Sequence, residues 1–197
     1  QISDEVAKAD YYLYKPRDYN MGVSISYSVD VAPGENAPSN LQITYVLNKE
    51  VGKDTPMSME IMDSNGKVVY SEATNEAPTA CDSFKRPQLK RSEGAHVYSW
   101  NMRIGMFDCL KEVTATSRNL SAYDAAPGKY KAKLTIGDFS QTQEFELKIH
   151  PNILSSIPNA AASYEERDRL SASLFKAATE MAKGVRDLRQ VQRQINF

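Results

Sequence analysis

The sequence contains few residues whose types and spacing would form a reaction centre. The two histidines, His96 and His150, are far apart in the chain and far from both cysteines. Glu165, Glu166 and Asp168 are the densest group of carboxylates, but acids at the start of a predicted helix more simply favour its dipole. The chain has no GxSxG nucleophile turn, no HExxH zinc motif and no glycine-rich phosphate loop. We therefore expect a non-catalytic chain with no metal site and no cofactor.

Two long polar segments, residues 73–94 and 104–126, are candidates for a binding function, because loops of this length are often functional. Phe107 and Tyr123 lie in the second segment. Their rings would either stack on a bound sugar or fill a gap in the local structure. A carbohydrate-binding loop is therefore one of the functions that the sequence leaves open.

The chain has two cysteines, Cys81 and Cys109, one in each of these polar segments. Neither belongs to a CxxC pair, which is the spacing typical of structural zinc sites. In an exported protein the two would be able to form a disulfide that joins the two loops. The alternative is a pair of free thiols.

Composition excludes several classes of partner. Lys and Arg number 24 against 25 Asp and Glu, which gives a formal net charge of −1 and no electrostatic case for nucleic acid. No apolar run approaches the roughly 20 residues of a membrane helix, so we do not expect an integral membrane protein. The chain begins at Gln1 without an initiating Met, as expected of a mature product or an excised fragment.

Alternation of apolar and polar residues predicts a series of short strands. They are expected at residues 11–16, 23–31, 41–47, 57–72 (a hairpin), 95–103 and 127–149 (a second hairpin). A two-residue turn at Gly137-Asp138 would pair Ile136 with Phe139 and Tyr130 with Phe145. The pattern predicts a mostly β chain that forms an immunoglobulin- or fibronectin-III-like antiparallel β-sandwich over residues 1–149, with residues 1–10 as a loose lead-in.

The chain changes character after this region. Residues 150–162 contain prolines and read as a linker, and Ser163 followed by Glu166 matches a capping box that starts a helix over residues 163–197. Small and apolar residues then recur at alternating spacings of four and three, which is a heptad pattern. We call these residues the seam: Leu170, Leu174, Ala177, Met181, Gly184, Leu188, Val191 and Ile195.

A helix of about 32 residues is about 48 Å long, more than twice the length of a typical strand of about 20 Å. It would lie on its own sandwich for about half its length, and the rest of the seam would face water unless a partner covers it. The expected partner is a protein: a second helix missing from this chain, a second copy, or a larger assembly. The large seam residues would make the contact: Leu170, Leu174, Met181, Leu188, Val191 and Ile195. The alternative is a helix that bends at Gly184 and folds back.

Several segments, in this order, resemble one known family. They are "LYKPRDY", "LQITYVL", "MSMEIMDSNGKVVY", "GAHVYSWNMR", "DAAPGKYKAKLTIGDFSQTQEFEL" and the helix "RDRLSASLFKAATEMAKGVRDLRQVQRQI". The chain is similar to the C-terminal region of bacterial sortilin-like (VPS10/BNR-repeat) β-propeller proteins, often labelled glycosyl hydrolases. The resemblance covers about residues 11 to 196 and implies an immunoglobulin-like domain followed by paired helices.

The resemblance also implies an exported protein that is periplasmic, at the cell surface or secreted. The Asp-box of propeller blades, SxDxGxTW, is absent, so no propeller and no glycosidase activity is expected in this chain. The predicted function is a non-catalytic accessory domain that docks or assembles through its helix. The alternatives are a carbohydrate-binding module and part of a hydrolase whose active site another domain completes.

Overall fold

The computed structural model describes residues 4–21, 39–74, 89–105 and 122–195. The predicted strand at 23–31, Phe107 and both cysteines lie outside these ranges. The helices and strands, in chain order, are α1 (Asp4–Lys8), β1 (Tyr11–Leu13), β2 (Tyr19–Met21), β3 (Leu41–Leu47), β4 (Met57–Met62), β5 (Val68–Ala73), β6 (Gly94–Trp100), β7 (Arg103–Ile104), β8 (Tyr123–Asp124), β9 (Gly128–Ile136), β10 (Phe139–Ile149), α2 (Pro151–Ser156) and α3 (Ala160–Ile195).

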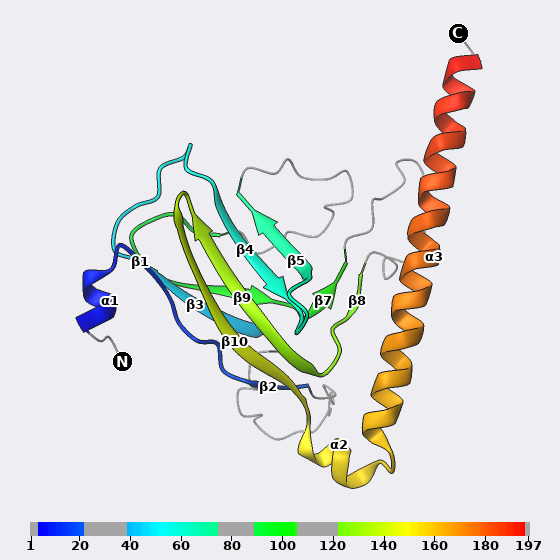
Figure 1. The fold of residues 1–197 in the computed structure, drawn as a ribbon, viewed down its shortest axis with the longest axis horizontal. Helices are drawn as coiled ribbons and strands as arrows, with labels where there is room; N and C mark the ends of the chain where they lie inside the picture. Colours follow the sequence, from blue (N-terminus) through cyan, green and yellow to red (C-terminus); the bar gives the residue numbers. More distant parts are fainter. Residues whose placement is uncertain (1–3, 22–38, 75–88, 106–121, 196–197) are drawn as a thin grey trace, which may run out of the picture.

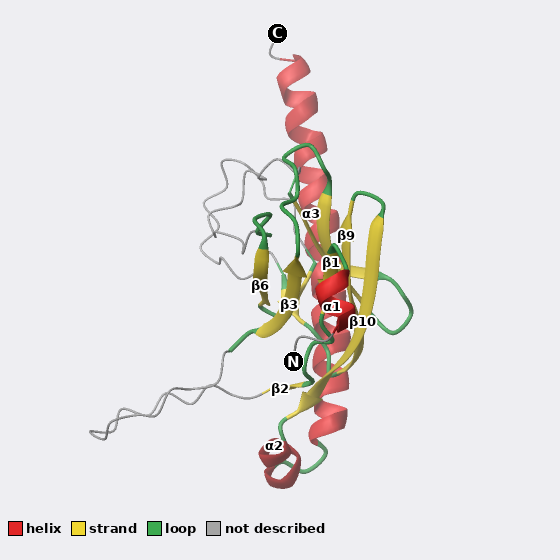
Figure 2. Ribbon diagram, turned by 90° about the vertical axis from the view of Figure 1, so that its left-hand side faces the viewer, coloured by secondary structure: helices red, strands yellow, loops and turns green. Residues whose placement is uncertain are grey.

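The strands form three sheets. A three-stranded antiparallel sheet has the order β1-β3-β6, and a five-stranded sheet has the order β2-β10-β9-β4-β5. β7 and β8 form a separate two-stranded ribbon, and α3 runs along the side of the molecule next to it (Figure 1). Viewed from the side, the β3–β6 and β9–β10 layers lie apart with α3 behind them (Figure 2).

Buried residues of both larger sheets belong to one hydrophobic cluster. Leu41, Ile43, Tyr45 and Leu47 alternate along β3 with half-buried residues, as the period of two predicts. Trp100 of β6 is 1% exposed, and its ring centroid lies 6.1 Å from that of Tyr130 and 6.2 Å from that of Phe145. These aromatic contacts join the three-stranded sheet to the β9–β10 hairpin.

Both predicted hairpins are confirmed. In the β9–β10 pair, Ile136 faces Phe139 and Tyr130 faces Phe145, as the turn at Gly137-Asp138 predicts. Between β4 and β5, the amide of Gly66 donates to the carbonyl oxygen of Asp63 at 3.0 Å, and Gly66 has a φ of 79°. That left-handed conformation favours glycine, which explains its place in the turn.

Two glutamines connect β1 to the inner face of β10. The amide of Leu13 donates to Oε1 of Gln141 at 2.7 Å, and Nε2 of Gln143 donates to the carbonyl oxygen of Leu13 at 3.0 Å. Leu13 is fully buried, so its backbone groups need such partners. The polar side chains at these two inward positions therefore replace a strand pairing between the two sheets.

Four expectations need correction. Strands hold about 39% of the described residues and helices about 32%, so the chain is mixed rather than mostly β. The sheets are not wholly antiparallel, because β2 pairs with β10 in parallel. The lead-in contains helix α1, in which Val6 is 3% exposed. The carbonyl oxygen of Val6 accepts a hydrogen bond from Nδ2 of Asn48 at 2.7 Å. The predicted linker contains helix α2.

Replacing Gln143 with Ala removes the hydrogen-bond donor to the carbonyl oxygen of Leu13, a fully buried residue. We expect the free energy of unfolding to fall by about 1–3 kcal/mol, because an unpaired buried backbone group retains its desolvation cost. Urea unfolding measures the change. Thr142→Ala, on the exposed face of the same strand, is the matched control. An equal effect of both substitutions would contradict the assigned role of Gln143.

Two buried tyrosines predict a loss of stability in alkali. Burial raises the pKa of Tyr45 and of Tyr130 to about 12 each, and their hydroxyls donate to the carbonyl oxygens of Lys90 and Ala126. In the unfolded chain both hydroxyls ionise near pH 10. Between about pH 10 and pH 12 the unfolded state therefore binds fewer protons than the folded state, and stability decreases as pH rises.

Urea unfolding at about pH 9 and about pH 11.5 measures this dependence. Tyr130→Phe should show a shallower decrease than the parent chain, since one of the two groups is gone. A slope that Tyr130→Phe leaves unchanged would show that this hydroxyl does not contribute.

Candidate docking surface

Helix α3 is continuous over 36 residues and passes through Gly184 without a break, so the bent alternative is not observed. It begins at Ala160, three residues before the predicted start. Ser163 is already inside the helix, because its amide donates to the carbonyl oxygen of Asn159 at 3.0 Å. Glu166 does not complete a capping box: it pairs with Arg169 at 2.6 Å, and that contact lowers the pKa of its carboxyl group.

The helix is seated on the body through Phe175. The ring centroid of Phe175 lies 5.3 Å from that of Tyr123 in β8. A Cβ atom added to Gly105 would lie only 2.5 Å from the Phe175 ring, so the ring rests directly on that backbone. Gly105 also has a φ of 81°, which disfavours any residue with a side chain.

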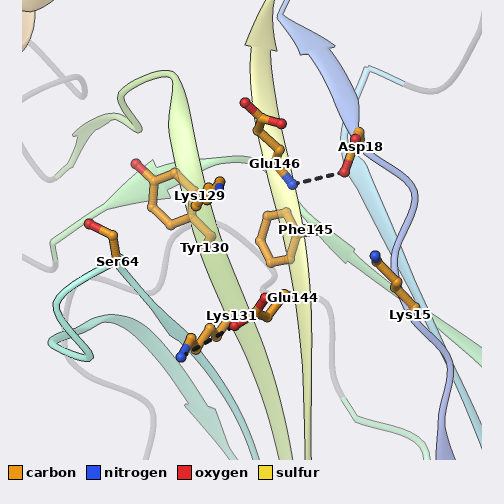
Figure 3. Close-up of a pocket in the computed structure, with 9 residues that line it drawn as sticks. All are labelled: Lys15, Asp18, Ser64, Lys129, Tyr130, Lys131, Glu144, Phe145 and Glu146. Carbon is orange, nitrogen blue, oxygen red and sulfur yellow. Dashed lines mark hydrogen bonds and ion pairs between the residues drawn. The ribbon is translucent and has the colours of Figure 1, made fainter.

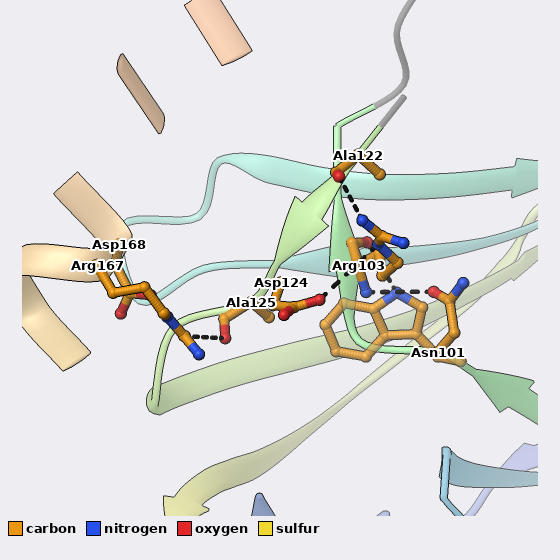
Figure 4. Close-up of polar contacts among 8 residues, drawn as sticks. Asn101, Arg103, Ala122, Asp124, Ala125, Arg167 and Asp168 are labelled. Atoms are coloured by element: carbon orange, nitrogen blue, oxygen red, sulfur yellow. Dashed lines mark hydrogen bonds and ion pairs between the residues drawn. The ribbon is translucent and has the colours of Figure 1, made fainter. Parts of the chain in front are cut away.

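The ribbon that carries this seat is held by Arg103 (Figure 4). Its Nη2 donates to the carbonyl oxygen of Ala122 at 2.6 Å, and its Nε lies 3.8 Å from the Asp124 carboxylate. The carbonyl oxygen of Arg103 accepts from Nε1 of Trp100 at 3.3 Å. The seat of α3 is thus connected through β7 to the aromatic core.

A second contact lies about two helical turns before Phe175. Nη2 of Arg167 donates a hydrogen bond to the carbonyl oxygen of Ala125 at 3.4 Å (Figure 4). The same nitrogen forms an ion pair with the carboxylate of Asp168 at 2.6 Å. The guanidinium also lies 4.6 Å from the centre of the Tyr164 ring. Burial, with a contribution from the charge of Asp168, raises the pKa of Tyr123. Together these contacts fix how α3 is turned about its own axis.

The face of α3 with reduced exposure is built from small, polar and aromatic residues. Buried and half-buried positions recur at Ala160, Tyr164, Arg167, Asp168, Ser171, Phe175, Ala178, Ala182, Val185, Arg186 and Arg189. At 100° per residue, the later part of this stripe is roughly 120° from the seam. The seam therefore does not rest on the body, and the expected half-coverage by the sandwich is not observed.

The large seam residues are all exposed. Their exposed fractions are Leu170 47%, Leu174 70%, Met181 69%, Leu188 71%, Val191 50% and Ile195 76%. Exposed apolar side chains in one continuous row are unusual on an isolated soluble chain. Among the described residues, no helix combines the length and the apolar composition that crossing a bilayer takes.

The other predicted site residues lie apart from the seam or outside the described ranges. Tyr123, expected in a ligand loop or as a local plug, has its ring against Phe175 and so serves the seat of α3. Phe107, Cys81 and Cys109 lie outside the described residues. Sequence reasoning missed Phe175, and the signal that could have found it is an aromatic residue placed off the seam of an otherwise regular heptad pattern.

Described residues line two of the hollows in the molecule. The larger, about 890 Å³, lies between α3 and the body and includes Val68, Ile104, Lys129 and Phe175 in its lining. None of the described residues that line it belongs to the seam. The smaller, about 320 Å³, is a groove on the β9–β10 hairpin that includes Lys131 and other charged residues (Figure 3).

The charges of the smaller groove hold neighbouring segments together. Asp18 accepts from the amide of Glu146 at 3.0 Å and pairs with Lys148 at 2.6 Å. The hydrogen bond from Lys148 lowers the pKa of the Asp18 carboxyl group. Lys131 pairs with Glu144 at 3.4 Å (Figure 3). These groups attach the segment before β2 to the hairpin, which is a structural role.

Gly105→Ala should release α3 from its seat, because the added Cβ collides with the Phe175 ring and the backbone conformation is strained. The expected result is faster amide hydrogen exchange in residues 160–182 with β9 and β10 still protected. Phe175→Ala should act in the same direction, and Leu174→Ala, on the exposed seam, is the matched control. Unchanged exchange in Gly105→Ala would contradict the assigned seat.

Comparison with known proteins adds no function to this geometry. No protein-family model matches the chain, and no curated protein matches it. The likeness of its motifs to sortilin-like proteins therefore stays a prediction.

Proposed function

We propose that this chain is a non-catalytic docking domain that binds a protein partner through the seam of α3. The observation that carries the proposal is the exposure of the six large seam residues on a helix already seated through a different face. A helix that only covered its own body would turn its apolar face inward. Here Phe175 and Arg167 hold the apolar face outward.

The seam is large enough to matter energetically. Complete burial of one such side chain contributes about 1.5–3 kcal/mol, so the exposed fractions correspond to about 6–11 kcal/mol for the six. Association costs about 4–15 kcal/mol in lost freedom. A partner surface that is equally apolar adds a similar gain of its own, which makes stable docking feasible.

We extend the proposal to the rest of the chain. The two larger sheets act as an immunoglobulin-like sandwich that serves as a scaffold, which the shared hydrophobic cluster supports. The order of the sequence motifs supports an exported, sortilin-like parent protein. Carbohydrate binding is less well supported, because the ring of Tyr123 is engaged by Phe175.

Site-specific crosslinking in the source cells tests the docking proposal. A photo-crosslinking amino acid in place of Leu188 should form one defined protein adduct. The same amino acid in place of Gln190, which is also exposed but points away from the seam, is the matched control and should form little adduct. Adding Leu174→Asp should weaken the adduct at position 188, because a carboxylate in an apolar interface is unfavourable.

Equal adducts at both positions, or none at position 188, would contradict docking through the seam. Circular dichroism of each variant shows whether α3 remains helical, so that a lost adduct is not mistaken for a lost helix.

A further inference from the structure

The seam combines two features that restrict its partner. In heptad notation, Leu174, Met181, Leu188 and Ile195 occupy a positions, and Leu170, Ala177, Gly184 and Val191 occupy d positions. All four a residues are large, whereas two neighbouring d residues are small. The row therefore has a shallow depression at Ala177 and Gly184.

No close neighbour among the described residues accounts for glycine at position 184. Apart from the helix's own nearby backbone, a Cβ atom added there would meet no atom of the described residues within 4 Å. Glycine in the middle of a helix is unfavourable relative to alanine, so the position carries a cost without an internal reason. A large side chain from outside, seated over Gly184, would supply the reason.

The two flanks of the seam differ in charge. The flank beside the body, at e positions, has Ser171, Ala178, Val185 and Gln192, all uncharged. The other flank, at g positions, includes two exposed acids, Glu180 and Asp187, of which Glu180 also borders the larger hollow. Within the described ranges neither acid forms an ion pair. Lys176 and Lys183 lie on the same side at c positions, one step farther from the seam.

A second copy of α3 fits this surface poorly in either orientation. In a parallel pair, d positions face each other, so Ala177 and Gly184 would meet their own equivalents and leave voids, which are unfavourable. In an antiparallel pair overlapping along the whole seam, Met181 would fill the space over Gly184 of the second copy. That arrangement also places Glu180 beside Asp187 of the second copy, and like charges in contact are destabilising.

From these features we infer that the seam takes an amphipathic helix of a different sequence, with large apolar side chains over Ala177 and Gly184 and with Lys or Arg beside Glu180 and Asp187. This inference rests on the proposed docking function and specifies its partner. The apolar row supplies the contact area, the depression at Ala177 and Gly184 sets the register, and the acidic flank selects for basic partners.

Two synthetic helical peptides of about four heptads test the inference with the full chain. Both carry Leu at every seam-facing position, and their flanking positions are Lys in one and Glu in the other. We expect the Lys peptide to bind about tenfold more tightly at low salt, because two ion pairs replace two like-charge contacts. The preference should shrink in high salt and reverse in the Glu180→Lys/Asp187→Lys variant.

Further variants test the depression and the electrostatic assignment. Gly184→Leu should weaken binding of the Lys peptide at least tenfold, whereas Gly184→Ala should not. Lys176→Glu with Lys183→Glu is the control for charge changes away from the seam and should alter the peptide preference less. Sedimentation equilibrium of the chain alone should show a monomer at concentrations that saturate the Lys peptide.

The outcomes separate this inference from the proposed function. Failure of both peptides to bind would overturn docking through the seam altogether. Equal binding of both peptides, together with no effect of Gly184→Leu, would leave docking in place and overturn the partner chemistry. Self-association tighter than peptide binding would show that the occupant is a second copy.

Discussion

The contact between Phe175 and the backbone of Gly105 decides which way α3 faces. A ring seated on a glycine with a left-handed backbone leaves no room for a different rotation of the helix. Arg167 reaches the carbonyl oxygen of Ala125 from the same side, so two points along the helix specify one orientation. The exposure of the seam depends on this seat, since a rotation of the helix by about a third of a turn would bury the leucines.

The seat is itself built on the core. Tyr123 belongs to a two-residue strand that would not be stable alone, and Arg103 connects that ribbon to Trp100. Trp100 in turn contacts the β9–β10 hairpin through Tyr130 and Phe145. A chain of contacts therefore runs from the centre of the sheets to the helix. Substitutions in the core would therefore change the position of α3 by displacing the β7–β8 ribbon.

The sequence predicted the sheets well where local rules apply. The β9–β10 register follows from a two-residue turn and alternating side chains, so it needs no knowledge of the rest of the fold. β7 and β8 are too short to leave a periodic signal. The contact of Gly105 with Phe175 joins residues far apart in the chain, and only the folded structure brings them together.

The helix shows a different limit of sequence reasoning. Its apolar row is the strongest pattern in the chain, and such rows normally mark the face that covers a protein's own core. The row predicted the helix correctly, but its large residues are exposed along the whole helix rather than covered by the sandwich for about half of it. It did not identify the face that contacts the body, because Ala160, Ser171, Ala178 and Ala182 carry little apolar signal. Close approach of a helix needs small residues as much as large ones.

The free end of α3 has a mechanical consequence. Arg189 is the last residue of the described helix with reduced exposure, and Ile195 lies six residues farther along, a span of about 9 Å. That span is a rigid arm that extends from a fixed point beside the body (Figure 1). A force applied near Ile195 therefore reaches the half-buried Arg189 first and, farther along the same helix, the ring of Phe175.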